Sequence, residues 1–179
     1  MPEVYMVDTA LYRRYQSSFS RLTVDSSVFG SAGFDGKLCE DGIVYDLGQP
    51  LQLFVFDKEG TLVNYYTNCY GTGFPNLSWN RQGEFDVFPP KQARMLPFGN
   101  KPISFPDIRR TFAAVATNGN MASSPDYSIV IFCNIFMGRQ SRRFVNSVQK
   151  SLSHKKSSCT VNVYYVNNDN LYCREKLWN

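Results

Sequence analysis

The chain has 179 residues, of which 43% are hydrophobic and 15% aromatic, and its net charge is +4. This length suits one domain with a sizeable core, and so high an aromatic content excludes an intrinsically disordered protein. No stretch reaches the ~18 apolar residues that a membrane-spanning helix needs. The first residues lack a basic start and an apolar run, so we expect no signal peptide.

A helix is predicted at the start of the chain. Leu11, Tyr15 and Phe19 recur every four residues, and Tyr12 lies beside them. We therefore expect a helical arm over residues 1–24. It packs either on its own domain or on a neighbouring subunit, and the sequence leaves both alternatives open.

Short β-strands are predicted to follow the arm. Serine and glycine residues predict a loop over residues 26–36, and residues 43–47 can form a short strand. A hairpin is the clearest local prediction. Residues 51–56 and 61–66 are two strand-prone runs, and a turn that contains Gly60 joins them.

The rest of the chain predicts further strands and one helix. Phe144, Val148 and Leu152 recur on one face of a helix over residues 139–152. Strands are expected at 84–88, 111–117, 128–137, 160–166 and 171–178, with the second and third joined across 118–120 and the last two forming a hairpin across 167–170. Seven or eight short strands at this spacing predict a mainly β, single-domain β-sandwich over residues 25–179, with an N-terminal helix and one further helix.

No group of residues predicts catalysis. The single histidine, His154, lies between a serine and two lysines, in a segment typical of a solvated surface. Asp57 and Asp169 lie in turn-like sequence, where aspartate usually bonds to backbone amides. We therefore expect a protein that is not an enzyme and has no metal and no cofactor. A hydrolase built on carboxylates alone is the one catalytic alternative left open.

A basic segment without acidic residues spans residues 139–156. One interpretation is a solvated helix face, and the other is an anion site for RNA, a nucleotide or an acidic partner surface. Single-strand binders place aromatic side chains among their basic residues, but here Phe144 lies on the apolar face. The candidate anion site consists of Arg139, Arg142, Arg143 and Lys150.

Tyrosine is abundant, with 11 residues, and four tyrosines form adjacent pairs. Such residues suit half-buried strand positions. A second interpretation is contacts between subunits that alkali breaks, because a phenol ionises at about pH 10 and buried phenolates repel each other. The candidates for these contacts are Tyr65, Tyr66, Tyr164 and Tyr165. Trp79 suggests a third kind of function, an exposed aromatic surface for carbohydrate.

The first third of the chain combines a helix that bears arginine and tyrosine with the run GQPLQLFVF at residues 48–56, a glycine turn and TLVN at residues 61–64. This layout resembles the polyhedrins of cypoviruses, which crystallise inside infected insect cells as occlusion bodies. The resemblance implies trimers locked into a lattice, embedded virus particles, accumulation in the cytoplasm of the infected host cell and release in an alkaline gut.

The leading hypothesis is therefore a structural, self-assembling matrix protein whose assembly arm is Leu11, Tyr12, Tyr15 and Phe19. Its expected partners are further copies of itself and virus particles, with no membrane, and a nucleic acid or nucleotide is not favoured. The alternative is a β-sandwich module that binds RNA or another polyanion through residues 139–156.

Overall fold

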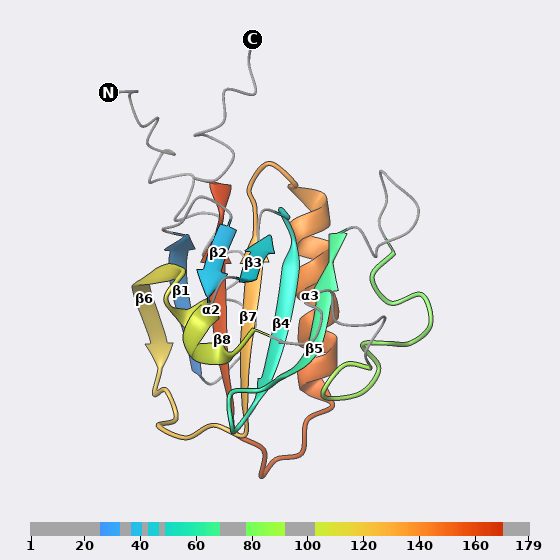
Figure 1. The fold of residues 1–179 in the computed structure, drawn as a ribbon. Coiled ribbons are helices and arrows are strands. Elements are labelled where there is room, and N and C mark those ends of the chain that lie inside the picture. The colour runs from blue at the N-terminus through green and yellow to red at the C-terminus, as the bar shows by residue number, and fades with distance from the viewer. Residues whose placement is uncertain are drawn as a thin grey trace, which may run out of the picture.

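The computed structural model describes residues 26–32, 37–40, 43–46, 49–68, 78–91 and 103–169. The predicted helical arm, with Leu11, Tyr12, Tyr15 and Phe19, lies outside these residues, as does the predicted strand at 171–178. The elements are β1 (Ser26–Ala32), β2 (Lys37–Glu40), β3 (Ile43–Asp46), β4 (Gln52–Asp57), β5 (Leu62–Thr67), α2 (Phe105–Arg109), β6 (Phe112–Gly119), β7 (Tyr127–Cys133), α3 (Arg139–Ser153) and β8 (Val161–Asn167) (Figure 1).

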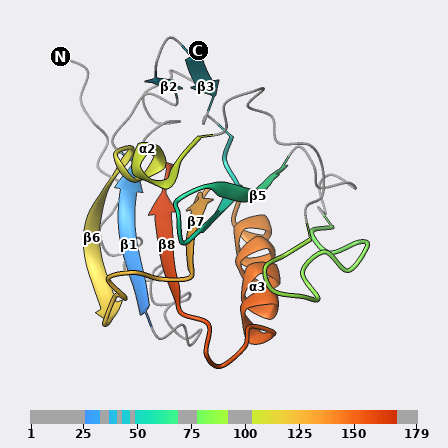
Figure 2. The same ribbon diagram turned by 60° about the horizontal axis from the view of Figure 1, so that its bottom comes forward.

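Six of the strands form one mixed sheet in the order β5-β4-β7-β8-β1-β6. β4 pairs antiparallel with β5 and with β7, and β1 pairs antiparallel with β6. β7, β8 and β1 run parallel to one another. Because adjacent parallel strands need a crossover connection, α3 links β7 to β8 across one face of the sheet. Figures 1 and 2 place α2 and α3 on opposite faces.

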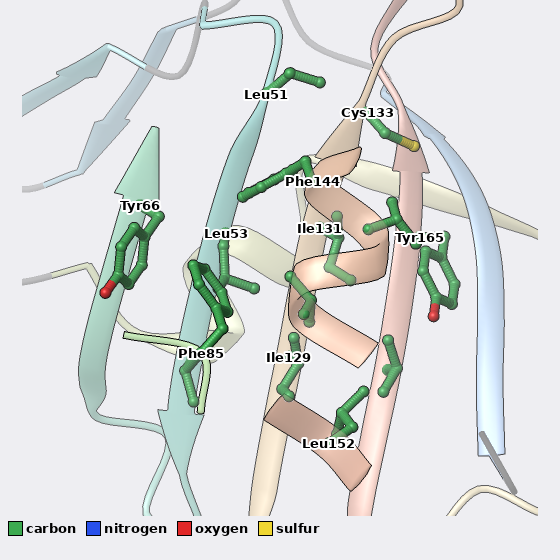
Figure 3. Close-up of a cluster of buried hydrophobic side chains, with 14 of the residues drawn as sticks. Leu51, Leu53, Tyr66, Phe85, Ile129, Ile131, Cys133, Phe144, Leu152 and Tyr165 are labelled. Atoms are coloured by element: carbon green, nitrogen blue, oxygen red, sulfur yellow. The ribbon is translucent and has the colours of Figure 1, made fainter. Parts of the chain in front are cut away.

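Most residues of the central strands β7 and β8 are apolar, since both of their faces are covered, and Ser128 and Asn162 are buried polar exceptions. Ile129 and Ile131 point to the side of α3, whereas Val130 and Phe132 point to the side of α2. Figure 3 shows the layer on the α3 side, where side chains of the helix meet those of β4, β5, β7 and β8. The domain therefore has two apolar layers, one on each face of a single sheet.

One face of α3 packs against the sheet, and the helix also contacts the segment 78–91. The helix buries Phe144, Val145, Val148 and Leu152 against the sheet. The Trp79 ring lies 4.3 Å from the Phe144 ring, and Ser151 Oγ donates to the carbonyl of Val87. The opposite face of α3 is left exposed to solvent. The helix predicted over residues 139–152 is confirmed.

The fold is a β-rich single domain, as predicted, but the described residues contain no sandwich of seven or eight strands. Helices, not a second large sheet, cover the main sheet; the second sheet of the described region contains only β2 and β3. The cause is the parallel pairing of β7 with β8, which periodicity along one strand cannot reveal.

The predicted hairpin over residues 51–66 is confirmed, with Leu53 opposite Tyr66. Two other hairpin pairings predicted from the sequence are wrong. β6 lies at the far edge of the sheet beside β1 and is not joined to β7 as a hairpin. β8 has parallel neighbours on both sides, so the predicted hairpin across 167–170 has no free edge of β8 to use.

Two local predictions are also corrected. The Ser- and Gly-rich loop predicted over residues 26–36 contains β1, whose backbone pairs on both sides with β8 and β6. Residues 84–88 form turns instead of an edge strand. Phe85 is fully buried there, and the Asp86 amide donates to the Gly83 carbonyl at 3.2 Å. In both places tertiary contacts override local composition.

Candidate functional site

The exposed face of α3 carries the residues of the predicted anion site. Arg139, Arg142, Arg143 and Lys150 are all exposed. Lys150 Nζ, however, lies 2.6 Å from Asp86 Oδ1 in a salt bridge to the segment 78–91. Lys150 is thus tied to the segment 78–91, and the other basic residues of α3 all lie in its first two turns.

α3 begins with three exposed arginines, and we call Arg139, Arg142 and Arg143 the arginine surface. The first turn contains no acidic residue. Arg139 and Arg142 have no acidic partner among the described residues. With a rise of about 1.5 Å per residue, Arg139 and Arg143 stand about 6 Å apart along the helix axis. Cations at a helix N-terminus oppose the helix dipole, so local helix stability does not explain them.

An exposed aromatic ring lies next to the arginine surface in the chain. Phe136 is 70% exposed, whereas the fully buried phenylalanines such as Phe132 and Phe144 are 0% exposed. β7 ends at Cys133, and residues 134–138, which we call the β7–α3 turn, lead into α3. The strand predicted over 128–137 is therefore too long, and sequence reasoning missed Phe136 as a surface residue.

Hydrogen bonds fix the β7–α3 turn. The Met137 amide donates to Asn134 Oδ1 at 3.2 Å, and the Gly138 amide donates to the Ile135 carbonyl at 2.9 Å. Gly138 adopts φ +45°, a conformation that side chains disfavour. These contacts define where Phe136 is presented.

A buried polar cluster after β8 supports the same turn. Asp169 Oδ1 accepts a hydrogen bond from the Ile135 amide at 2.9 Å, and Asp169 Oδ2 accepts one from Asn167 Nδ2 at 2.5 Å. Burial raises the pKa of the Asp169 carboxyl, against the lowering effect of hydrogen bonds from Asn167 and from the Ile135 and Phe136 amides. Asp169 therefore bonds to backbone amides, as predicted, and ties the β7–α3 turn to the end of β8.

The four candidate tyrosines lie inside the domain. The exposed fractions of Tyr65, Tyr66, Tyr164 and Tyr165 are 4%, 3%, 9% and 4%. Tyr65 donates its phenol proton to Gln52 Oε1 at 3.0 Å, and Tyr66 donates to the carbonyl of Lys91. Burial raises the pKa of Tyr66 and Tyr164 and raises that of Tyr165 to about 12. These phenols are internal groups and form no exposed surface.

A cleft of about 630 Å³ is lined by residues of the β4–β5 turn and of the loop between α3 and β8. Figure 1 places these two segments at the opposite end of the sheet from the β7–α3 turn. His154, Cys159 and Asp126 line it together with Phe88 and Lys156. Burial is the main cause that raises the pKa of the Cys159 thiol, so at neutral pH the cleft offers no thiolate.

Asp126 has a structural role at this cleft. Its Oδ2 accepts hydrogen bonds from the Thr160 amide at 2.7 Å and from Thr160 Oγ1 at 2.9 Å. These contacts join the start of β7 to the start of β8. Within the described ranges no group of three His, Cys, Asp or Glu side chains could hold a metal ion.

Trp79 does not provide the exposed surface that the carbohydrate hypothesis requires. Its side chain is 6% exposed and packs on Phe144. The helices described here include none that is both long and apolar enough to cross a membrane. The chain matches no known protein family, no curated protein and no solved structure. The arrangement of residues at the arginine surface is therefore the basis for proposing a function.

Proposed function

We propose that this domain is a polyanion-binding module and that its interface is the arginine surface of α3. The observation that supports this most strongly is the grouping of exposed Arg139, Arg142 and Arg143 in the first two turns of the helix. A general solvated face would mix charges of both signs. Here the helix begins with basic residues alone, against its own dipole.

The choice of arginine supports the proposal further. A guanidinium group donates hydrogen bonds in a fixed fork that matches two phosphate oxygens, and it remains charged at every physiological pH. Lys150, the one lysine of the predicted site, is held in a salt bridge. We therefore place the interface at the three exposed arginines in the first two turns of α3.

Charge reversal with a matched control tests the proposal. The double variant Arg142→Glu/Arg143→Glu changes the net charge by −4, and so does Lys58→Glu/Lys156→Glu, which alters exposed residues at the cleft at the other end of the sheet. We expect the arginine variant to lose most of its affinity for a fluorescent polyanion such as heparin, and the control to lose little. The salt slope of binding should also flatten in the arginine variant alone.

Two results would contradict the proposal. One is undetectable binding by the unaltered protein at low salt. The other is an equal loss in both variants, which would mean that net charge, not the arginine surface, governs binding.

The occlusion-body hypothesis stays a prediction from the resemblance. Its test is expression of the untagged chain in insect cells, followed by a search for intracellular crystals that persist at pH 7 and clear towards pH 11, since phenols ionise at about pH 10. Because the four candidate tyrosines are internal, alkali acting on them would loosen the subunit itself. Soluble protein without particles would remove this hypothesis.

A further inference from the structure

Phe136 is an unusual residue of this surface. Among the residues whose side-chain exposure the structure describes, only Phe136 and Val87 are exposed large hydrophobic residues, at 70% and 39%. Burial of a phenylalanine gains about 1.5–3 kcal/mol, yet this ring stays in water while the core nearby is filled. Folding of the domain therefore gives no reason for an aromatic residue at this position.

The ring is carried by a fixed segment. The β7–α3 turn is held by Asn134, by the Gly138 amide and by the carboxylate of Asp169. Phe136 precedes Arg139 by three residues, so the exposed ring and the first arginine of α3 are close neighbours along the chain.

An exposed ring that precedes three exposed arginines in one short segment matches one ligand chemistry in particular. Single-stranded nucleic acid offers phosphates to the arginines and unpaired bases that can stack on an aromatic ring. A duplex keeps its bases stacked on one another, and heparin or polyphosphate has no base. Phe144 is fully buried and offers no such ring, whereas Phe136 is exposed.

We infer that the arginine surface binds single-stranded nucleic acid, with Phe136 stacking on a base while Arg139, Arg142 and Arg143 bind the phosphates on either side. This inference rests on the proposed polyanion-binding function and names its ligand class. It assigns the ring a role that an electrostatic surface alone does not need.

The test compares two ligands and three variants, with a duplex RNA as a third ligand for the unaltered protein. The ligands are a 12-nucleotide uridine RNA and inorganic polyphosphate of matched charge, and binding is measured by fluorescence polarisation or by calorimetry. Phe136→Ala should weaken RNA binding by about 5- to 150-fold, which is the range for loss of one stacked base, and should leave polyphosphate binding unchanged. Phe136→Tyr should retain RNA binding, and Val87→Ala, at the other exposed apolar residue, should change neither ligand.

The outcomes separate this inference from the proposed function. Failure of the unaltered protein to bind either ligand would contradict both the proposed function and this inference. Binding of both ligands with no effect of Phe136→Ala on RNA overturns the stacking role and leaves the arginine surface intact. An equal loss for RNA and polyphosphate in Phe136→Ala would show that the ring only shapes the turn, which also overturns it. A duplex RNA of the same length that binds as tightly as the single strand would do the same.

Discussion

Phe136 and Phe144 lie eight residues apart and occupy opposite environments. Phe144 points from α3 into the core, where Trp79 covers it, whereas Phe136 lies in the β7–α3 turn and is 70% exposed. The helical period correctly placed Phe144 on the apolar face. No period applies to Phe136, because a turn, not a strand, contains it.

The two rings give a matched pair of stability variants. Phe144→Ala removes a fully buried ring and should lower the free energy of unfolding by about 3–5 kcal/mol. Phe136→Ala should change it by less than about 0.5 kcal/mol. Urea denaturation followed by circular dichroism measures both. A large loss in Phe136→Ala would show that its ring contributes to folding and would weaken the case for a ligand.

The raised pKa of the buried Tyr165 phenol predicts that the domain loses stability in alkali. Burial raises the pKa of its phenol to about 12, against an unfolded value of about 10. The stabilising contribution is therefore complete below about pH 10 and is lost as pH rises towards 12, because the unfolded chain releases this proton first. Tyr165→Phe should lower the stability by about 1 kcal/mol at neutral pH through loss of the contact with Gln149, and it should flatten the alkaline slope. Denaturation at a series of pH values checks this, and an unchanged slope would contradict it.

At the scale of elements, the β7–α3 connection determines the candidate site. Asn134 ends β7 by accepting hydrogen bonds on its carbonyl from Ser141 Oγ at 2.5 Å and on its side chain from the Met137 amide. Gly138 then allows the sharp entry into α3. These two residues, Asn134 and Gly138, are the sequence signal that could have ended the predicted strand before Phe136.

Gly138→Ala tests whether the backbone conformation at this connection disfavours a side chain. A Cβ would find space, since its nearest neighbour is the Ile135 carbonyl oxygen at 3.9 Å, but φ +45° disfavours any L residue. We expect the free energy of unfolding to fall by about 1–3 kcal/mol. Asn146→Ala, at an exposed position of the same helix, is the control and should be neutral or slightly stabilising. Equal effects in thermal denaturation would argue against a conformational cost at Gly138.

Local signals predicted some elements well and others poorly. The apolar runs of β4, β5, β7 and β8 and the period of α3 are visible within each segment, so these elements were found. β1 was missed because serine and glycine suggest a loop, and its strand conformation depends on two distant partners, β8 and β6. The arginines of the site were found for the same local reason, whereas the salt bridge of Lys150 with Asp86 required the tertiary fold.

At the scale of the molecule, one sheet carries two apolar layers. β7 and β8 lie at its centre with both faces covered, and β5 and β6 form its edges. Backbone amides whose hydrogens exchange only when the whole domain unfolds should therefore lie mainly in β7 and β8.

Hydrogen exchange checks this arrangement. Peptides from residues 127–133 and 161–167 should exchange most slowly, and those from β5 at the edge should exchange faster. A slower β5 than β8 would contradict the strand order.

The place of β1 in the sheet also affects synthesis of the protein. Among the described strands, β6 pairs with β1 alone, and β1 joins the remaining sheet only through β8. The ribosome makes β8 after every other described strand, so the β1–β6 pair cannot join β7 until residue 167 has emerged. A chain that stalls before Thr160 would keep the edges of β1 and β7 unpaired, which is the kind of exposed backbone that aggregates. Nascent chains of this protein should therefore depend on chaperones until the end of the sheet has been translated.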